Sequence, residues 1–153
     1  MKTLEINSTS PNATIEIAQK FAKLLNNKDT VILTGELGAG KTKFVEGFLS
    51  YFNLQDEISS PTFNIVNEYP THTHNIYHFD VYRLEDVDEF YAIGGEEYFE
   101  KGICLIEWGE IIKDLLPKDY IQITLKKDNI NENIRILEFK AFGEKYEKLL
   151  DTF

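Results

Sequence analysis

An eight-residue segment constrains the possible folds of this chain more than any other feature of the sequence. Residues 35–42 read Gly-Glu-Leu-Gly-Ala-Gly-Lys-Thr and match the phosphate-loop pattern G-x-x-x-x-G-K-[ST] at every position. Glycines let such a loop curl until successive backbone N–H groups point at phosphate oxygens, and the helix that follows directs its positive dipole end toward the same anion. A loop of this type therefore needs a buried strand before it and a helix after it.

The residues on both sides of the loop meet this requirement. Residues 30–34 form a largely apolar run of the kind that is buried on both faces in parallel sheets. After the loop, Phe44, Val45, Phe48 and Leu49 recur at helical spacing. The sequence therefore predicts a strand, a phosphate loop and a helix in that order, and with them a site for a nucleoside triphosphate.

Two side chains of the loop have defined roles in this chemistry. Lys41 is expected to bridge the β- and γ-phosphates, and the hydroxyl of Thr42 is expected to ligate Mg²⁺. ATP and Mg²⁺ are therefore the predicted cofactors. The predicted nucleotide contacts in and beside the loop are Glu36, Leu37, Gly38, Ala39, Gly40, Lys41, Thr42 and Lys43.

The remaining elements predict a single domain that spans residues 1–153. Two runs, 63–69 and 75–83, flank a polar turn and are expected to pair as an antiparallel hairpin. The pattern as a whole favours an α/β fold, a P-loop NTPase-like three-layer domain with a mixed parallel and antiparallel sheet. The predicted strands are residues 1–6, 30–34, 63–69, 75–83, 103–106, 120–126 and 134–142, and the predicted helices are residues 11–26, 41–49, 86–99 with a break at Gly94-Gly95, a short one ending at 116, and 144–150.

The composition limits the partners of this domain. The formal net charge is −10, and a surface this acidic repels nucleic-acid backbones. Docking onto a more basic protein is therefore expected in place of direct binding to nucleic acid. The one cysteine, Cys104, lies in an apolar run and is expected in the core. No apolar stretch has the length of a signal peptide or a membrane span, so we expect a cytoplasmic protein without membrane contact.

Glu107 is the first carboxylate that could complete the site. It follows the apolar run 103–106, which reads as a second strand buried on both faces. The carboxyl ends of parallel strands form the ligand crevice of an open α/β sheet. If this strand runs parallel to residues 30–34, Glu107 faces the phosphate loop and acts as the acid that holds Mg²⁺. An ordinary solvated acid at a strand end is the alternative.

Asp80 is the second candidate carboxylate. The side-chain period of a strand places His78, Asp80 and Tyr82 on one face and the apolar Phe79 and Val81 on the other, which is the expected core side. A polar site on the first face and a plain solvent-exposed face of a hairpin are both compatible with this pattern.

Two further residues are candidates for contacts with the nucleotide. Thr62 lies downstream of the loop helix in Ser59-Ser60-Pro61-Thr62-Phe63, where switch segments of P-loop proteins often sit, although local turn hydrogen bonds also explain these residues. Trp108 follows Glu107 and could form a wall of the site, a docking contact or a packing contact.

Four motifs together resemble those of one protein family, the small bacterial ATPases required for tRNA threonylcarbamoyladenosine biosynthesis (TsaE). Their order and spacing and the length of the chain are similar to the family, and the resemblance is weakest near the C-terminus. The motifs are Thr34 with the loop 35–42, Ser60-Pro61-Thr62-Phe63, His78-Phe79-Asp80-Val81-Tyr82-Arg83, and Ile106-Glu107-Trp108.

The resemblance implies a function and a set of partners. Members of the family act with a transferase subunit and its inactive paralogue in the complex that modifies the adenosine next to the anticodon. The small ATPase is slow alone and is stimulated by these partners, and it meets tRNA only indirectly. The acidic composition of this chain agrees with a subunit that leaves tRNA binding to its partners.

The resemblance also implies roles for individual residues. It implies that Lys41, Asp80 and Glu107 are catalytic. The sequence departs from the family pattern at Glu36, where many relatives carry Asp. Mg²⁺ is implied to be held by Thr42 and Glu107. The implied nucleotide contacts outside the loop are Thr62, Trp108 beside the site and, by looser analogy, Thr9 and Arg135.

Three other functions share the phosphate loop. A small-molecule or nucleotide kinase usually brings several arginines to the transferred phosphoryl group, and this chain has two, Arg83 and Arg135. A GTPase usually carries an Asn-Lys-x-Asp element after the loop, which is absent from this sequence. An assembly factor that senses ATP without hydrolysing it would differ from the ATPase only in its activity with the partner complex.

Overall fold

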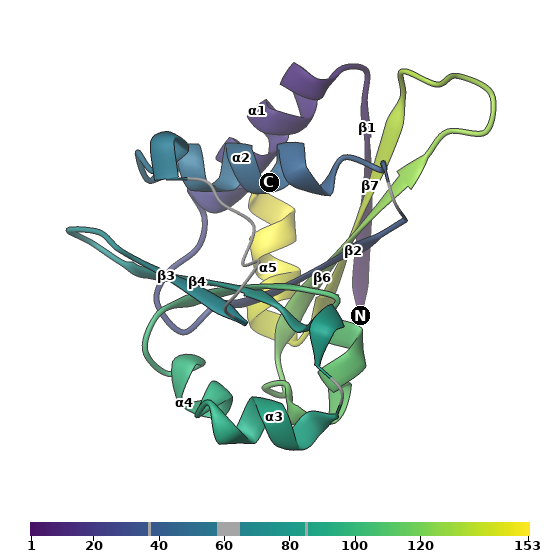
Figure 1. The fold of residues 1–153 in the computed structure, drawn as a ribbon. Coiled ribbons are helices and arrows are strands. Elements are labelled where there is room, and N and C mark those ends of the chain that lie inside the picture. Colours follow the sequence, from purple (N-terminus) through teal and green to yellow (C-terminus); the bar gives the residue numbers. More distant parts are fainter. Residues whose placement is uncertain (37, 58–64, 85) are drawn as a thin grey trace.

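The structure is a computed structural model that describes residues 1–36, 38–57, 65–84 and 86–153. In these residues one seven-stranded sheet has the order β1-β7-β6-β2-β5-β4-β3 (Figure 1). The strands are β1 Lys2–Ser8, β2 Thr30–Gly35, β3 Val66–Pro70, β4 Asn75–Asp80, β5 Ile103–Glu107, β6 Tyr120–Lys127 and β7 Arg135–Phe142. The helices are α1 Pro11–Ala22, α2 Lys41–Tyr51, α3 Val87–Ala92, α4 Gly95–Tyr98 and α5 Glu144–Thr152, and the 3₁₀ turns are η1 Gln55–Glu57, η2 Val81–Arg83 and η3 Gly109–Leu115.

The sheet is mixed, as the sequence predicts. Its centre is parallel, because β2 pairs in parallel with both β6 and β5, and β5 pairs in parallel with β4. Antiparallel pairs complete both sides: β7 and β1 follow β6 on one side, and β3 follows β4 on the other. The carboxyl ends of β6, β2, β5 and β4 therefore meet at one edge of the sheet, the edge at which ligands bind in open α/β folds.

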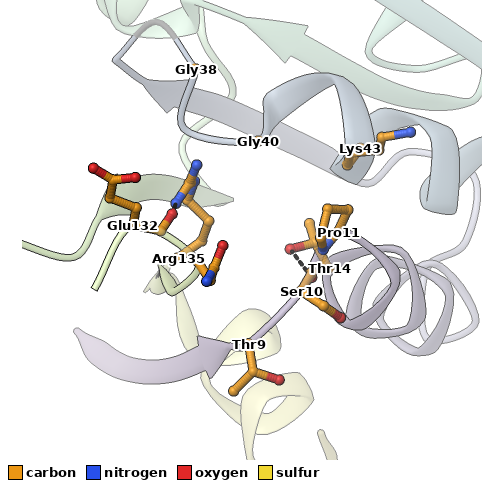
Figure 2. Close-up of a pocket in the computed structure, with 10 residues that line it drawn as sticks. Thr9, Ser10, Pro11, Thr14, Gly38, Gly40, Lys43, Glu132 and Arg135 are labelled. Carbon is orange, nitrogen blue, oxygen red and sulfur yellow. Dashed lines mark hydrogen bonds between the residues drawn. The ribbon is translucent and has the colours of Figure 1, made fainter.

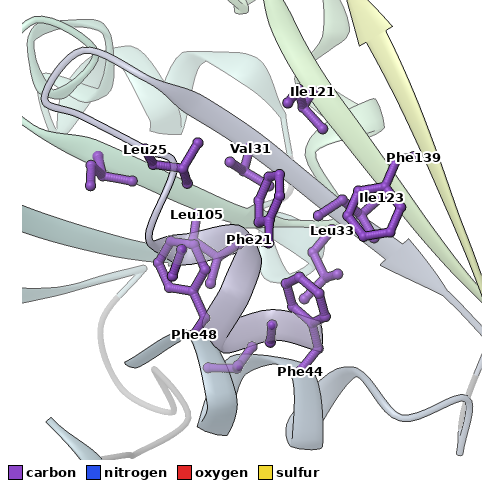
Figure 3. Close-up of a cluster of buried hydrophobic side chains, with 14 of the residues drawn as sticks. Phe21, Leu25, Val31, Leu33, Phe44, Phe48, Leu105, Ile121, Ile123 and Phe139 are labelled. Atoms are coloured by element: carbon purple, nitrogen blue, oxygen red, sulfur yellow. The ribbon is translucent and has the colours of Figure 1, made fainter. Parts of the chain in front are cut away.

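Helices cover both faces of the sheet, which makes the predicted three layers. Helices α1 and α2 lie on one side and α3 and α4 on the other (Figure 1). Figure 3 shows the first core, where Phe21 of α1 and Phe44 of α2 pack with Val31 and Leu33 of β2. Ile32, between these two strand residues, belongs instead to the second core under α3 and η3. The alternation of β2 residues between two apolar cores explains why its sequence is continuously apolar.

The second core contains Cys104 of β5, as the sequence predicts. Its side chain is fully buried, and this burial raises the pKa of the thiol to about 12. A thiol in this state is a packing group, because the nucleophilic and metal-binding form is the thiolate.

Helix α1 begins as the sequence predicts and ends earlier. The Ser10 hydroxyl oxygen accepts the N–H of Ala13 at 3.0 Å, and Pro11 occupies the first helical turn. The predicted end near residue 26 is wrong, because the helix stops at Ala22. The buried carboxylate of Asp29 accepts the N–H of Asn26 at 2.7 Å and so stabilises a turn where the apolar spacing would have continued the helix.

The predicted strand 75–83 is also too long. β4 ends at Asp80, whose carboxylate accepts the N–H of Tyr82 at 3.1 Å and starts the 3₁₀ turn η2. A local side-chain hydrogen bond of this kind competes with continuation of a strand. The predicted short helix that ends at residue 116 is likewise a 3₁₀ segment, η3. Residues 63 and 64 of the first hairpin strand lie outside the described part of the chain.

None of the helices in the described residues is long and apolar enough to cross a membrane.

Candidate nucleotide-binding site

The phosphate loop connects the central strand β2 to α2 at the carboxyl edge of the sheet. Gly38 and Gly40 have φ values of 79° and 102°, a left-handed region that favours glycine. Gly40 caps α2 without a side-chain hydrogen bond, so the first turn of this helix directs its N–H groups outward. Ala39 donates its N–H to the carbonyl oxygen of Glu36 at 3.1 Å, which closes the turn of the loop. Leu37 lies outside the described residues.

A cavity of about 260 Å³, which we call the phosphate pocket, lies at the start of α2. It brings together three residues that the sequence assigns to one site, Lys41, Thr42 and Glu107. Glycine backbone, an ammonium group, a hydroxyl and a carboxylate therefore surround one space, as a site for phosphates and a cation requires. The lining residues are Gly38, Gly40, Lys41, Thr42, Lys43 and Glu107.

Glu107 reaches the pocket because β5 runs parallel to β2, the strand arrangement on which its predicted place beside the phosphate loop depends. Leu33 and Glu107 are paired in the register of these two strands. On the other side of β5, Asp80 at the end of β4 is the register partner of Glu107. The two candidate carboxylates are therefore neighbours on adjacent strands, although position 107 lies 27 positions after position 80 in the sequence.

The protein groups at the pocket are compatible with Mg²⁺. The Thr42 hydroxyl and the Glu107 carboxylate are oxygen ligands of the type that Mg²⁺ prefers. No group of three or more His, Cys, Asp or Glu side chains in the described part of the chain is arranged to hold a metal ion. Mg²⁺ in nucleotide sites is usually bound through one or two protein oxygens together with phosphates and water, so such a cluster is not needed.

The predicted polar row on β4 is only partly correct. His78 and Asp80 share a face of β4, but Tyr82 lies on the 3₁₀ turn η2 and is 64% exposed. The face that carries His78 is also buried: His78 is 2% exposed, while Phe79 is 0% exposed on the other face. Both faces of β4 are therefore buried, so the alternation of its side chains does not distinguish a solvent-exposed face from a buried one.

His78 makes a direct contact with the candidate metal ligand. Its Nε2 lies 2.7 Å from Oε2 of Glu107, and the two side chains are 3% and 16% exposed. The sequence motif contained His78, but the spacing along the chain could not show that it meets Glu107 on the next strand.

Trp108 forms a wall of the site next to Lys41. The Lys41 ammonium nitrogen lies 3.9 Å from the centre of the Trp108 ring, a cation–π contact. The Tyr82 ring packs against the same indole, with ring centres 5.1 Å apart. Trp108 itself has a φ of 62°, which is uncommon for a bulky residue, and its N–H donates to the carbonyl oxygen of Leu33 at 3.0 Å.

A larger cavity of about 470 Å³, which we call the β1–α1 pocket, lies between the phosphate loop, the start of α1 and the start of β7 (Figure 2). It contains two residues, Thr9 and Arg135, that the family resemblance implies as nucleotide contacts by looser analogy. Thr9 follows β1, and Arg135 begins β7. In Figure 2 the Arg135 side chain extends toward the loop at Gly40, opposite Pro11 at the start of α1. Its lining residues are Thr9, Ser10, Pro11, Thr14, Gly38, Gly40, Lys43, Glu132, Asn133 and Arg135.

Sequence reasoning missed part of this second pocket. Ser10 and Thr14 read as helix-start residues, and Glu132 and Asn133 read as turn residues, so nothing in their pattern marked them as lining a cavity. The side chain of Arg135 is held by its own loop, because Nη1 donates to the carbonyl oxygen of Ile134 at 3.1 Å.

Lys127 is a cation near the loop that the sequence did not reveal. A Cβ atom on Gly38 would lie 3.1 Å from its ammonium nitrogen, and Lys127 is the register partner of Arg135. The Lys127 N–H also lies 3.5 Å from the exposed carboxylate of Glu36, at the long limit of a hydrogen bond. Thr62, the remaining predicted contact, lies outside the described residues.

Comparisons with known proteins agree with this arrangement. Residues 8–136 match the model of the family "Threonylcarbamoyl adenosine biosynthesis protein TsaE". The chain is similar to the tRNA threonylcarbamoyladenosine biosynthesis protein TsaE of Bacillus subtilis (39% identity over 152 residues, 99% of this chain and 94% of the relative) and of Rickettsia typhi (41% over 132 residues, 86% and 90%).

A solved structure shares the fold over almost the same length. The crystal structure of Bacillus subtilis YdiB matches with a TM-score of 0.79 and 33% sequence identity, over 99% of this chain and 93% of that one. The matched residues include the phosphate loop, both carboxylates and Arg135. The chain therefore belongs to the TsaE family of threonylcarbamoyl adenosine biosynthesis proteins.

Proposed function

We propose that this protein is an ATPase that binds Mg·ATP at the phosphate loop and serves the modification of tRNA by threonylcarbamoyladenosine. The names of its relatives support the pathway, and the phosphate pocket supports the chemistry. The observation that carries the proposal is the meeting of Lys41, Thr42 and Glu107 around one cavity, with Asp80 in register beside Glu107.

The first part of the mechanism is binding of the triphosphate. The N–H groups at the start of α2 and at Gly38 and Gly40 donate hydrogen bonds to the phosphate oxygens, and Lys41 leaves the Trp108 ring to bridge the β- and γ-phosphates. Thr42 and Glu107 would hold Mg²⁺, and the bound cation would supply positive charge next to the phosphate oxygens.

The second part is activation of water, which we assign to Asp80. One of its oxygens, Oδ1, accepts the N–H of Tyr82, and this contact orients the carboxylate at the end of β4. The other oxygen would accept a hydrogen bond from a water molecule that attacks the γ-phosphate. Asp80 is half-buried beside Glu107, so the water would be held next to the cation rather than in bulk solvent.

The β1–α1 pocket takes the nucleoside in this proposal. It adjoins the phosphate pocket, because both are lined by Gly38, Gly40 and Lys43. Arg135 lies in the β1–α1 pocket rather than in the phosphate pocket. That position suits a contact with the nucleotide and does not support the arginine-rich transfer site that a kinase uses.

The proposal includes two protein partners, a transferase subunit and its inactive paralogue, which stimulate hydrolysis. The net charge of −10 supports docking onto more basic proteins and contact with tRNA only through them.

The test is an ATPase assay of the protein alone and with the transferase pair. We expect slow Mg²⁺-dependent hydrolysis alone and faster hydrolysis with the pair. Chelation of Mg²⁺ and the Lys41→Ala variant are the two negative controls. Hydrolysis at background in the presence of the pair, with calorimetric binding of Mg·ATP intact, would make the protein a nucleotide-sensing assembly factor. Absence of Mg·ATP binding would overturn the proposal entirely.

A further inference from the structure

His78 is a buried polar side chain with one hydrogen-bond partner among the residues that the structure describes. Its Nε2 lies 2.7 Å from Oε2 of Glu107, and its Nδ1 is buried without a hydrogen-bond partner among the described residues. Burial of an imidazole with one nitrogen unpaired is costly, and the apolar first core would be better filled by a hydrocarbon side chain. The contact with Glu107 is therefore the feature that distinguishes histidine from an apolar residue at this position.

The sheet register determines which carboxylate His78 can reach. His78 is paired with Leu105, and Glu107 lies two residues farther along β5 on the same face. The histidine thus approaches Glu107 from inside the sheet, while the carboxylate lines the phosphate pocket at the edge. Its second oxygen, Oε1, has no hydrogen-bond partner in the described part of the structure.

We propose that His78 is a positioning residue: it holds Oε2 of Glu107 and thereby presents Oε1 to the cation bound in the phosphate pocket. A glutamate has three rotatable side-chain bonds, and ordering it when the cation binds would reduce affinity for the cation. A hydrogen bond that is already made in the sheet orders the carboxylate beforehand, as partners of metal ligands do in other sites. This inference rests on the proposed function, because it assumes that Glu107 is a ligand of Mg²⁺.

Three substitutions separate positioning from packing. His78→Phe keeps a ring of similar shape and removes the donor. His78→Gln places an amide nitrogen near the position of Nε2, whereas His78→Asn is too short to reach Glu107. Ile76→Val is the matched control. Ile76 is fully buried two residues earlier on the same face of β4, and it is not among the residues that line the phosphate pocket.

The measurement is the Mg²⁺ concentration needed to strengthen binding of a non-hydrolysable ATP analogue. Calorimetry gives the affinity for the analogue at each Mg²⁺ concentration and in excess EDTA. We expect His78→Phe and His78→Asn to need at least about tenfold more Mg²⁺ than the wild type, with unchanged affinity in EDTA. His78→Gln should restore most of the loss, and Ile76→Val should keep the wild-type Mg²⁺ requirement.

The outcomes distinguish this inference from the function on which it rests. If the wild type binds the analogue equally well with Mg²⁺ and in EDTA, the proposed function fails. If Mg²⁺ strengthens binding in the wild type and equally in His78→Phe, the proposed function stands and the positioning role is wrong. Should His78→Phe fail to fold in a thermal melt, the Gln and Asn variants decide: equal Mg²⁺ requirements for those two would overturn the inference.

Discussion

The phosphate pocket and the β1–α1 pocket adjoin the same loop but are built in different ways. Glu107, at the end of β5, and Lys41, at the start of α2, both line the phosphate pocket. Residues of these two elements pack in the two hydrophobic cores. The β1–α1 pocket is lined in part by loop residues, of which Thr9, Glu132 and Asn133 are all exposed. A position anchored in a sheet cannot shift without moving the core, whereas an exposed loop can adapt.

This difference suggests a division of labour. Chemistry needs groups held within a fraction of an ångström, which suits the carboxylates at the ends of β4 and β5. Recognition of a base and sugar tolerates more adjustment, which suits the turn before α1 and the loop before β7. Substitutions of the phosphate-pocket residues and of Asp80 should therefore strongly reduce triphosphate binding or hydrolysis. Substitutions in the β1–α1 pocket should weaken the affinity for ATP by small factors.

Lys41→Ala should have the largest effect. It removes the ammonium group that the proposal places on the β- and γ-phosphates, so we expect a loss of affinity for ATP on the order of 100-fold or more. Calorimetry with Mg·ATP measures it, and Lys148→Ala, at an exposed lysine of α5 that lines neither pocket, is the control. Affinity within threefold of the wild type would show that the phosphate pocket does not depend on this cation.

Asp80→Asn and Glu107→Gln should separate hydrolysis from binding. Each keeps the shape of the side chain and removes its charge, and we expect the hydrolysis rate with partners to fall at least about tenfold, which corresponds to about 1.4 kcal/mol of transition-state stabilisation. Single-turnover assays measure the rate, and calorimetry checks that ATP still binds. A wild-type rate in either variant would remove that carboxylate from the mechanism.

Arg135→Ala tests the β1–α1 pocket. We expect affinity for ATP to fall by about five- to tenfold, on the order of 1 kcal/mol, through loss of one side-chain contact. Inorganic tripolyphosphate should bind the variant and the wild type equally, because it fills only the phosphate pocket. A competition titration with both ligands measures the difference. If the affinity for tripolyphosphate falls as much as that for ATP, Arg135 serves the phosphates and the two pockets are not functionally separate.

Lys127→Ala should have the smallest effect. Its ammonium group is exposed and lies beside Gly38 rather than inside either pocket, so solvent screens its attraction for the triphosphate. We expect about a twofold loss of ATP affinity at low salt that disappears as ionic strength rises. Titrations at two salt concentrations, with Lys126→Ala on the same strand as control, measure it. A loss that persists at high salt would place Lys127 in direct contact with the nucleotide.

The sequence by itself determined the loop, the strand and helix around it, and the position of Glu107 at the end of β5, because these depend on local patterns. A glycine-rich turn after an apolar strand has few other interpretations, and the ends of buried strands are readable from where the apolar runs stop. The same local logic failed at Tyr82 and at residues 23–26, where backbone N–H groups donate hydrogen bonds to the carboxylates of Asp80 and Asp29 and the regular element ends. The spacing of apolar residues carries no information about such bonds.

Only the tertiary structure decided which distant residues meet. The strand order places β4 beside β5. The register of this pair brings His78 into contact with Glu107 and makes Asp80 the register partner of Glu107. The packing of η3 brings Trp108 under Lys41, and the β6–β7 pair carries Lys127 and Arg135 to the loop. Such contacts depend on hydrogen bonding between strands that are far apart along the chain, so no periodicity within one segment can encode them.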